Sequence, residues 1–164
     1  MPLRLNNIDE IQRVLHGPQE GEKPAGMLDE IVIKCANNAI KTLNAAREVW
    51  IIALQQPEPM ALTLEEWRKI LPRWFVEKCF PEISQEEALR RRALPMEEKI
   101  RFAEMWSLDA WLFWLKPSER QWRWWSSDLI DDTTIRLRVV VGDTPFASGA
   151  LKWLFKCSGA QFVE

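Results

Sequence analysis

The chain has 164 residues, 47% of them hydrophobic, with 22 basic and 24 acidic side chains and a net charge of −2. This length suits one domain with a sizeable core, and the near-neutral charge supplies no global field for nucleic acid. The N-terminal sequence lacks a signal-peptide pattern, and the densest apolar run, 106–115, is too short to span a bilayer. Three widely spaced cysteines argue against a disulfide framework, so we expect a cytoplasmic protein.

Residues 1–26 are predicted to form a flexible N-terminal arm. They contain few apolar residues with helical spacing, and 16–26 is interrupted by glycines and prolines. The remaining residues, 27–164, are expected to form a single α+β domain.

The longest periodic segment is 28–56, and it predicts one long helix. Its polar residues recur at steps of three or four, and Pro57 follows at the end. Twenty-nine residues would span roughly 43 Å at 1.5 Å per residue, which is longer than a domain of this size needs. The excess length suggests a homodimer that pairs through helix 28–56.

Several short helices are expected to follow, up to about residue 116. Thr63 with Glu66, and Ser84 with Glu87, have the spacing of capping boxes at helix starts. A nearly all-apolar helix is predicted over 108–115. The helical part of the domain therefore covers 27–116.

After Pro117 the hydrophobic period changes from helical to alternating. Strands are predicted at 121–125, 134–141 and 161–164, with a helix at 150–157 between the last two. The C-terminal part, 117–164, is thus a small β-β-α-β sheet unit, and the fold class is α+β. The order of the strands stays open.

The residues that usually carry catalysis are sparse. His16 is the one histidine, the cysteines lack the close pairs of a zinc site, and the glycines form no phosphate-binding loop. The glutamate doublets fit the first turns of helices, where they favour the helix dipole. We therefore expect no catalytic residue, no metal and no cofactor, and an enzyme is the less favoured class.

Six of the ten tryptophans lie between residues 106 and 125, and whether they are buried or bind a partner is the main question. Trp111 and Trp114 lie on the apolar helix, where burial is favoured and a partner-binding face is the alternative. In the sheet, alternation places Trp122 and Trp124 on the core side.

The same alternation sends four residues to the opposite face of the sheet: Arg123, Trp125, Arg136 and Arg138. An indole among three guanidinium groups suits cation–π contacts or an acidic protein partner. The simpler alternative is a solvated sheet face, with Trp125 lying flat under an arginine.

These observations favour a non-enzymatic interaction or regulatory module that binds another macromolecule, expected to be a protein, through this Arg/Trp surface. The alternative is a protein that binds a sugar, a cation or a flat heterocycle in a tryptophan-lined pocket. Its walls would come from Trp111, Trp114, Trp122 and Trp125, with Asp128 or Glu119 as a polar contact. A carboxylate-based enzyme ranks third, and nucleic acid binding ranks last because no sustained basic groove is present.

Overall fold

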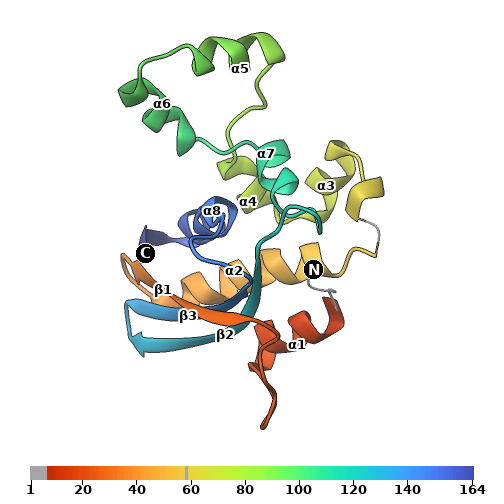
Figure 1. Cartoon of the computed structure of the whole chain (residues 1–164), viewed down its shortest axis with the longest axis vertical. Helices are drawn as coiled ribbons and strands as arrows, with labels where there is room; N and C mark the ends of the chain where they lie inside the picture. Colours follow the sequence, from red (N-terminus) through yellow and green to blue (C-terminus); the bar gives the residue numbers. More distant parts are fainter. Residues whose placement is uncertain (1–6, 58) are drawn as a thin grey trace.

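The computed structural model describes residues 7–57 and 59–164, and it shows an α+β fold (Figure 1). The helices are α1 (Asn7–His16), α2 (Ala39–Leu54), α3 (Leu64–Ile70), α4 (Arg73–Lys78), α5 (Gln85–Arg92), α6 (Met96–Ala103), α7 (Leu108–Phe113) and α8 (Gly149–Ser158), with a 3-10 turn at Pro59–Ala61. The strands are β1 (Met27–Cys35), β2 (Trp122–Asp131), β3 (Thr134–Val141) and β4 (Ala160–Val163). Within these described residues, none of the helices has the length and apolar character needed to cross a membrane.

The four strands form one antiparallel sheet in the order β2-β3-β1-β4. The α+β class and the C-terminal β-β-α-β unit predicted from the sequence are confirmed. The strand β1 was not predicted from the sequence. It lies between β3 and β4, so the sheet takes a central strand from a segment about a hundred residues earlier in the chain.

The prediction of one helix over 28–56 is wrong. Residues 27–35 form β1, and a helix begins only at Ala39. Ile31, Ile33 and Cys35 are buried while the residues between them are not, which is the period of two of a half-buried strand. Asn38 then caps α2, because its side chain accepts a hydrogen bond from the backbone of Lys41. The dimer expected along a long helix loses its basis, since β1 is internal to the sheet and α2 is packed in the core.

The structure also differs from the flexible arm expected at 1–26. Residues 7–16 form α1, which packs against β2 and α2, and Val14 is fully buried (Figure 1). Residues 1–6 lie outside the described part of the chain. The apolar residues of α1 are few, so the sequence gives only a weak helical pattern. A charged residue on the buried face of the helix, Glu10, forms an ion pair with Arg120.

The core lies between the sheet and helices α2 and α8. It contains a cluster of tryptophan and phenylalanine rings: Trp50 contacts Trp122 at a centroid distance of 4.9 Å, and Trp124 stacks on Phe155 at 5.8 Å. Trp122 and Trp124 therefore face the core, as alternation predicts. Rings at these separations are worth about 0.5–1.5 kcal/mol per pair beyond the area that they bury.

Trp125 departs from simple alternation because β2 carries a bulge at this residue. Trp124 pairs with Val139 and Ser126 pairs with Arg138, so Trp125 is the extra residue between two consecutive partners. It is only 6% exposed. The guanidinium carbon of Arg13, on α1, lies 5.0 Å from the centre of its ring.

Of the two capping boxes predicted from the sequence, the one at Thr63 is complete and the one at Ser84 is half formed. Thr63 and Glu66 form a complete capping box at the start of α3, and Ser84 accepts a hydrogen bond from the backbone of Glu87 at the start of α5. Gly159 ends α8 with a φ of 124°, a conformation that favours glycine, and a Cβ there would meet the Thr42 hydroxyl at 2.8 Å.

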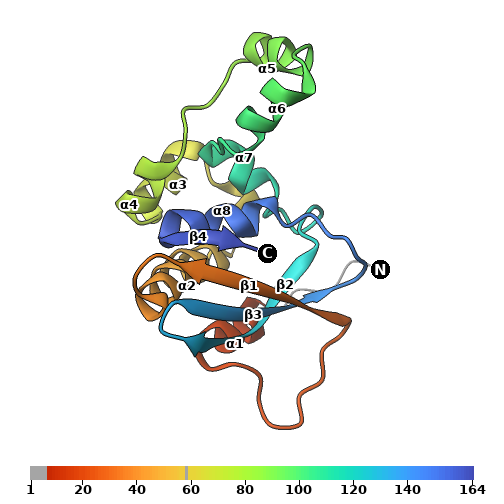
Figure 2. The same cartoon turned by 90° about the vertical axis from the view of Figure 1, so that its left-hand side faces the viewer.

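Helices α5 and α6 stand away from the rest of the molecule (Figures 1 and 2). Both views place them beyond α3, α4, α7 and α8, on the far side from the sheet. Neither helix contains a buried residue.

Candidate functional site

A buried ion pair joins α1 to the loop before β2. Both carboxylate oxygens of Glu10 lie 2.8 Å from Nη1 of Arg120, and Glu10 is 1% exposed. Glu10 also accepts hydrogen bonds from Nε1 of Trp50 at 3.2 Å and from the backbone N–H of Trp124 at 3.0 Å. This carboxylate thus connects α1, α2 and β2, and a charge buried so deeply is tolerated because it is fully hydrogen-bonded.

The guanidinium of Arg120 lies beside two indole rings that contact each other. Its carbon is 4.9 Å from the ring centre of Trp50 and 5.6 Å from that of Trp122. A planar cation over an indole face is favoured electrostatically, and more so where water is excluded. The ion pair and the two rings therefore pack together near the C-terminal end of α2.

Arg123 adds a second buried guanidinium close to this unit. Its Nη1 donates to the carbonyl of Trp122 at 2.7 Å, but its Nε has no partner among the described residues. Burial, followed by repulsion from Arg120, lowers the pKa of Arg123 to about 9, so the group is still charged at neutral pH. Glu10, Arg120 and Arg123 together therefore carry one surplus positive charge in the interior.

Replacing Arg123 with methionine is expected to raise the free energy of unfolding by about 1 kcal/mol, because it removes an unpaired buried charge. Urea unfolding at neutral pH measures the change. Arg138→Met on the open sheet face is the matched control and is expected to change stability by less than about 0.5 kcal/mol. A clear loss of stability in Arg123→Met would show that its guanidinium supports the fold.

Next to Arg120 lies a half-open cavity of about 350 Å³, between α2, α3 and α7. Trp50 and Trp67 contribute indole rings to its walls, and Trp67 is held in place by the capped helix α3. The other apolar lining residues are Ala53, Leu54, Pro59, Met60, Leu62, Leu64, Leu112, Phe113, Leu115 and Pro117. Its size lies within the range of roughly 300–1,000 Å³ that is typical of small-molecule sites.

A few polar groups complete the lining. Arg120 borders the cavity, Lys116 lies with its ammonium group 4.8 Å from the Phe113 ring centre, and Asn7 donates to the Leu54 carbonyl. Asp109 is exposed, and its carboxylate already accepts hydrogen bonds from the Ser107 hydroxyl and the following backbone N–H. The donors that remain for a ligand are therefore mainly cationic.

The tryptophans of the predicted apolar helix have structural surroundings. Trp111 is fully buried, packs edge-on against Phe75 at 4.7 Å, and donates from Nε1 to the carbonyl of Ala150 at 3.0 Å. Trp114 is half-buried and lies edge-on to Phe113 at 5.4 Å. Neither ring lines the cavity.

The four residues predicted for the Arg/Trp face are divided in two by the bulge and by α1. Arg123 and Trp125 are buried, with Trp125 under the guanidinium of Arg13. Arg136 and Arg138 lie half-exposed on the open face of the sheet.

There Arg136 donates from Nη2 to Asp128 at 2.5 Å, and both arginines lie near Glu30. The structure therefore places no tryptophan of β2 on the open face beside these arginines.

Two of the three cysteines, Cys79 and Cys157, lie in surroundings that disfavour the thiolate. Burial raises the pKa of Cys157 to about 12 and also raises that of Cys79. Within residues 7–57 and 59–164, His, Cys, Asp and Glu form no group of three that could hold a metal ion.

The sequence alone did not point to Glu10, Arg120, Trp50 or Trp67. One signal was present: Glu10 and Val14 are spaced four apart and share the buried face of α1, so an acidic residue lay on an apolar stripe. The partner of that carboxylate lies 110 residues away, and only the folded chain brings the two together.

Comparison with known proteins adds nothing to this geometry: no family model, curated protein or solved structure matches the chain.

Proposed function

We propose that this protein binds a small, flat and largely apolar molecule with one anionic group in the cavity between α2, α3 and α7. The observation that carries the proposal is a ligand-sized space with two indole walls beside a buried arginine. Pockets of this kind take most of their affinity from apolar contact and their orientation from a few fixed polar groups.

The shape and chemistry of the walls favour a flat apolar ligand. Trp50 and Trp67 are 2% and 5% exposed, so their rings are held by the protein and only a small part of each is open to the cavity. Rigid aromatic walls lose little conformational entropy when a ligand binds, which favours affinity.

The charges near the cavity favour an anion over a cation. Glu10 neutralises one of the two buried arginines, and Lys116 adds a cation at the rim. Among the lining residues that the structure describes, Asp109 is the acidic one, and it is exposed and already hydrogen-bonded. A carboxylate near Lys116 and Arg120 therefore meets a positive local potential.

Isothermal titration calorimetry with three naphthalene probes tests the proposal: naphthoate, naphthylmethanol and naphthylmethylamine. We expect naphthoate to bind most tightly, the neutral alcohol less tightly and the amine weakest. Lys116→Met should weaken naphthoate about fivefold, equivalent to about 1 kcal/mol, and leave the alcohol unchanged. Lys41→Met, on the exposed side of α2, is the matched control.

A second variant closes the cavity. Ala53 belongs to the lining, and Ala53→Phe is expected to abolish binding of all three probes because its ring occupies the same space. Ala36→Phe, at an exposed position between β1 and α2, serves as its control and should bind normally. Unchanged binding in Ala53→Phe, or no binding in the unmodified protein, would contradict the proposal.

Binding of another macromolecule is the second candidate function. Its support comes from the exposed apolar residues of α5 and α6 rather than from the Arg/Trp sheet face, since Trp125 is covered by α1.

A further inference from the structure

Residues 83–105, which include α5 and α6, form a protrusion from the body of the protein (Figure 2). The chain leaves the body at Phe80 and returns at Trp106, where the Phe80 N–H donates to the Trp106 carbonyl at 2.8 Å. Trp106 in turn packs against Gly149, where a Cβ would approach its ring to 2.6 Å. None of the residues of the protrusion is buried.

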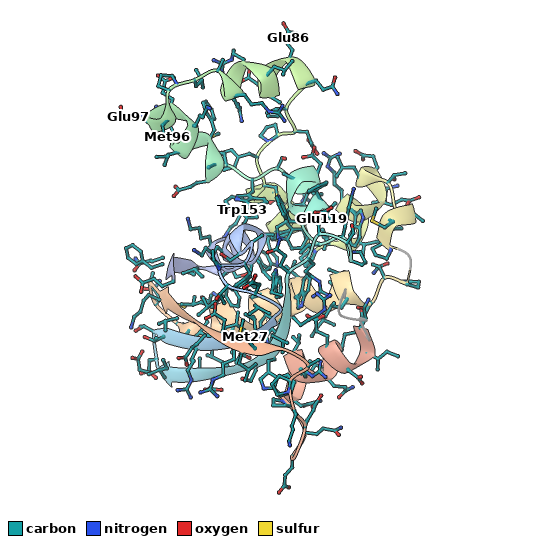
Figure 3. All side chains as sticks on the ribbon, viewed as in Figure 1. Met27, Glu86, Met96, Glu97, Glu119 and Trp153 are labelled. Atoms are coloured by element: carbon teal, nitrogen blue, oxygen red, sulfur yellow. The ribbon has the colours of Figure 1, made fainter. Side chains whose placement is uncertain are left out.

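Large apolar side chains of the protrusion are open to solvent. Leu89 is 62% exposed on α5, and Met96 and Ile100 are 69% and 58% exposed on α6. Met96 and Ile100 are four residues apart and so lie on one face of their helix. Figure 3 shows Glu86, Met96 and Glu97 pointing away from the body of the molecule.

The protrusion has few internal contacts that would hold two helices in place. Arg91 lies over the ring of Phe102 at 4.0 Å, and Glu87 forms ion pairs with Arg90 and Arg91 within α5. Isolated helices shorter than about 12–15 residues are marginal in water, and α5 and α6 have 8 residues each. A surface that covers their apolar residues would supply the missing stabilisation.

The charge pattern of α5 and α6 indicates which kind of partner surface would cover their apolar residues. α5 begins with Glu86 and Glu87 and ends with three arginines, and α6 begins with Glu97 and Glu98 and ends with Arg101. Each helix is therefore acidic at its start and basic at its end. If a second copy of the same helix lies antiparallel to the first, its basic end faces the acidic end of the first helix and its acidic end faces the basic end. A partner surface of a single charge sign is complementary to only one of the two ends.

We propose that two copies of this chain pair through their protrusions about a two-fold axis, which buries Leu89, Met96 and Ile100 between them. In such an interface the same patch is used on both copies, so it must be complementary to itself. The acidic first turn of a helix in one copy lies beside the basic last turn of that helix in the other. Leu89 and Ile100 lie between these ends of their helices, and Met96 lies at the start of α6.

Sedimentation equilibrium over a range of concentrations is the first test. We expect a particle of twice the chain mass of 19.3 kDa for the unmodified protein. Leu89→Ser combined with Ile100→Ser should weaken dimerisation at least tenfold without changing the far-UV spectrum. Ile130→Ser, at an equally exposed position beyond the protrusion, is the control and should leave the mass unchanged.

A charge exchange tests the identity of the partner surface. One variant carries Glu86→Lys and Glu97→Lys, and the other carries Arg92→Glu and Arg101→Glu. Each variant alone should be monomeric, because like charges then meet across the axis, and their mixture should form a one-to-one dimer detectable by native mass spectrometry. A monomeric unmodified protein, or charge variants that dimerise alone, would overturn the proposal.

Discussion

Replacing Glu10 with alanine is expected to lower the free energy of unfolding by about 3–5 kcal/mol, the cost of removing one partner from a buried ion pair. The substitution leaves the Arg120 guanidinium in the interior without its counter-ion. It also leaves the Trp50 indole N–H and the Trp124 backbone N–H without their acceptor. α1 keeps its other contacts with the body, including the buried Val14 and Arg13 over Trp125, so we expect the helix to be loosened rather than released.

Urea unfolding, followed by tryptophan fluorescence, measures this loss. Asp9→Ala is the matched control, because Asp9 is the neighbouring carboxylate of α1 and is exposed. It should change stability by less than about 0.5 kcal/mol. If Glu10→Ala lost less than about 1 kcal/mol, the ion pair would not be holding α1 in place.

Replacing Trp125 with alanine is expected to cost about 3 kcal/mol, within the range for deleting a buried aromatic side chain. The ring is 6% exposed and lies under Arg13, so its removal leaves a cavity between β2 and α1.

Thermal and urea unfolding give this value, with Phe113→Ala as the control, because the Phe113 ring is 42% exposed. A loss for Trp125→Ala no larger than that of Phe113→Ala would mean that the indole is open to solvent. The Arg/Trp face expected from alternation would then regain its support.

Local patterns were sufficient to predict the C-terminal unit of the fold. Ile135, Leu137 and Val139 alternate with polar residues, and this regularity predicts β3 without any tertiary information. The capping box at Thr63 is equally local, because its two hydrogen bonds join residues three apart. Such signals survive because the interactions that create them lie within one element.

The segment 28–56 shows where local patterns fail. The spacing of Glu30 and Lys34 fits a helix as well as a strand, since a step of four is a multiple of two. The pairing of β1 with β3, which joins residues about a hundred apart, decides in favour of the strand. Periodicity alone held no information about that partner.

The candidate site was out of reach of the sequence for the same reason. Glu10 and Trp50 lie in α1 and α2, and Arg120 lies in the loop before β2, inside the tryptophan-rich segment; contacts between residues far apart in the sequence bring the three together. The segment 106–125 contains six tryptophans, and for this reason most of the candidate binding residues were predicted there. The structure uses most of those rings as core, and the indoles that line the cavity come from α2 and α3.

Indole N–H signals test directly whether the cavity beside Arg120 binds a flat anion, as we propose, because the chain has ten tryptophans. Each indole N–H gives its own signal in a proton–nitrogen NMR spectrum, and Trp50→Phe and Trp67→Phe assign the two that matter. We predict that titration with naphthoate shifts the signals of Trp50 and Trp67 together and in proportion, and leaves that of Trp114 unchanged. Shifts at Trp114 without shifts at Trp50 and Trp67, or no shift at any indole, would contradict the claim.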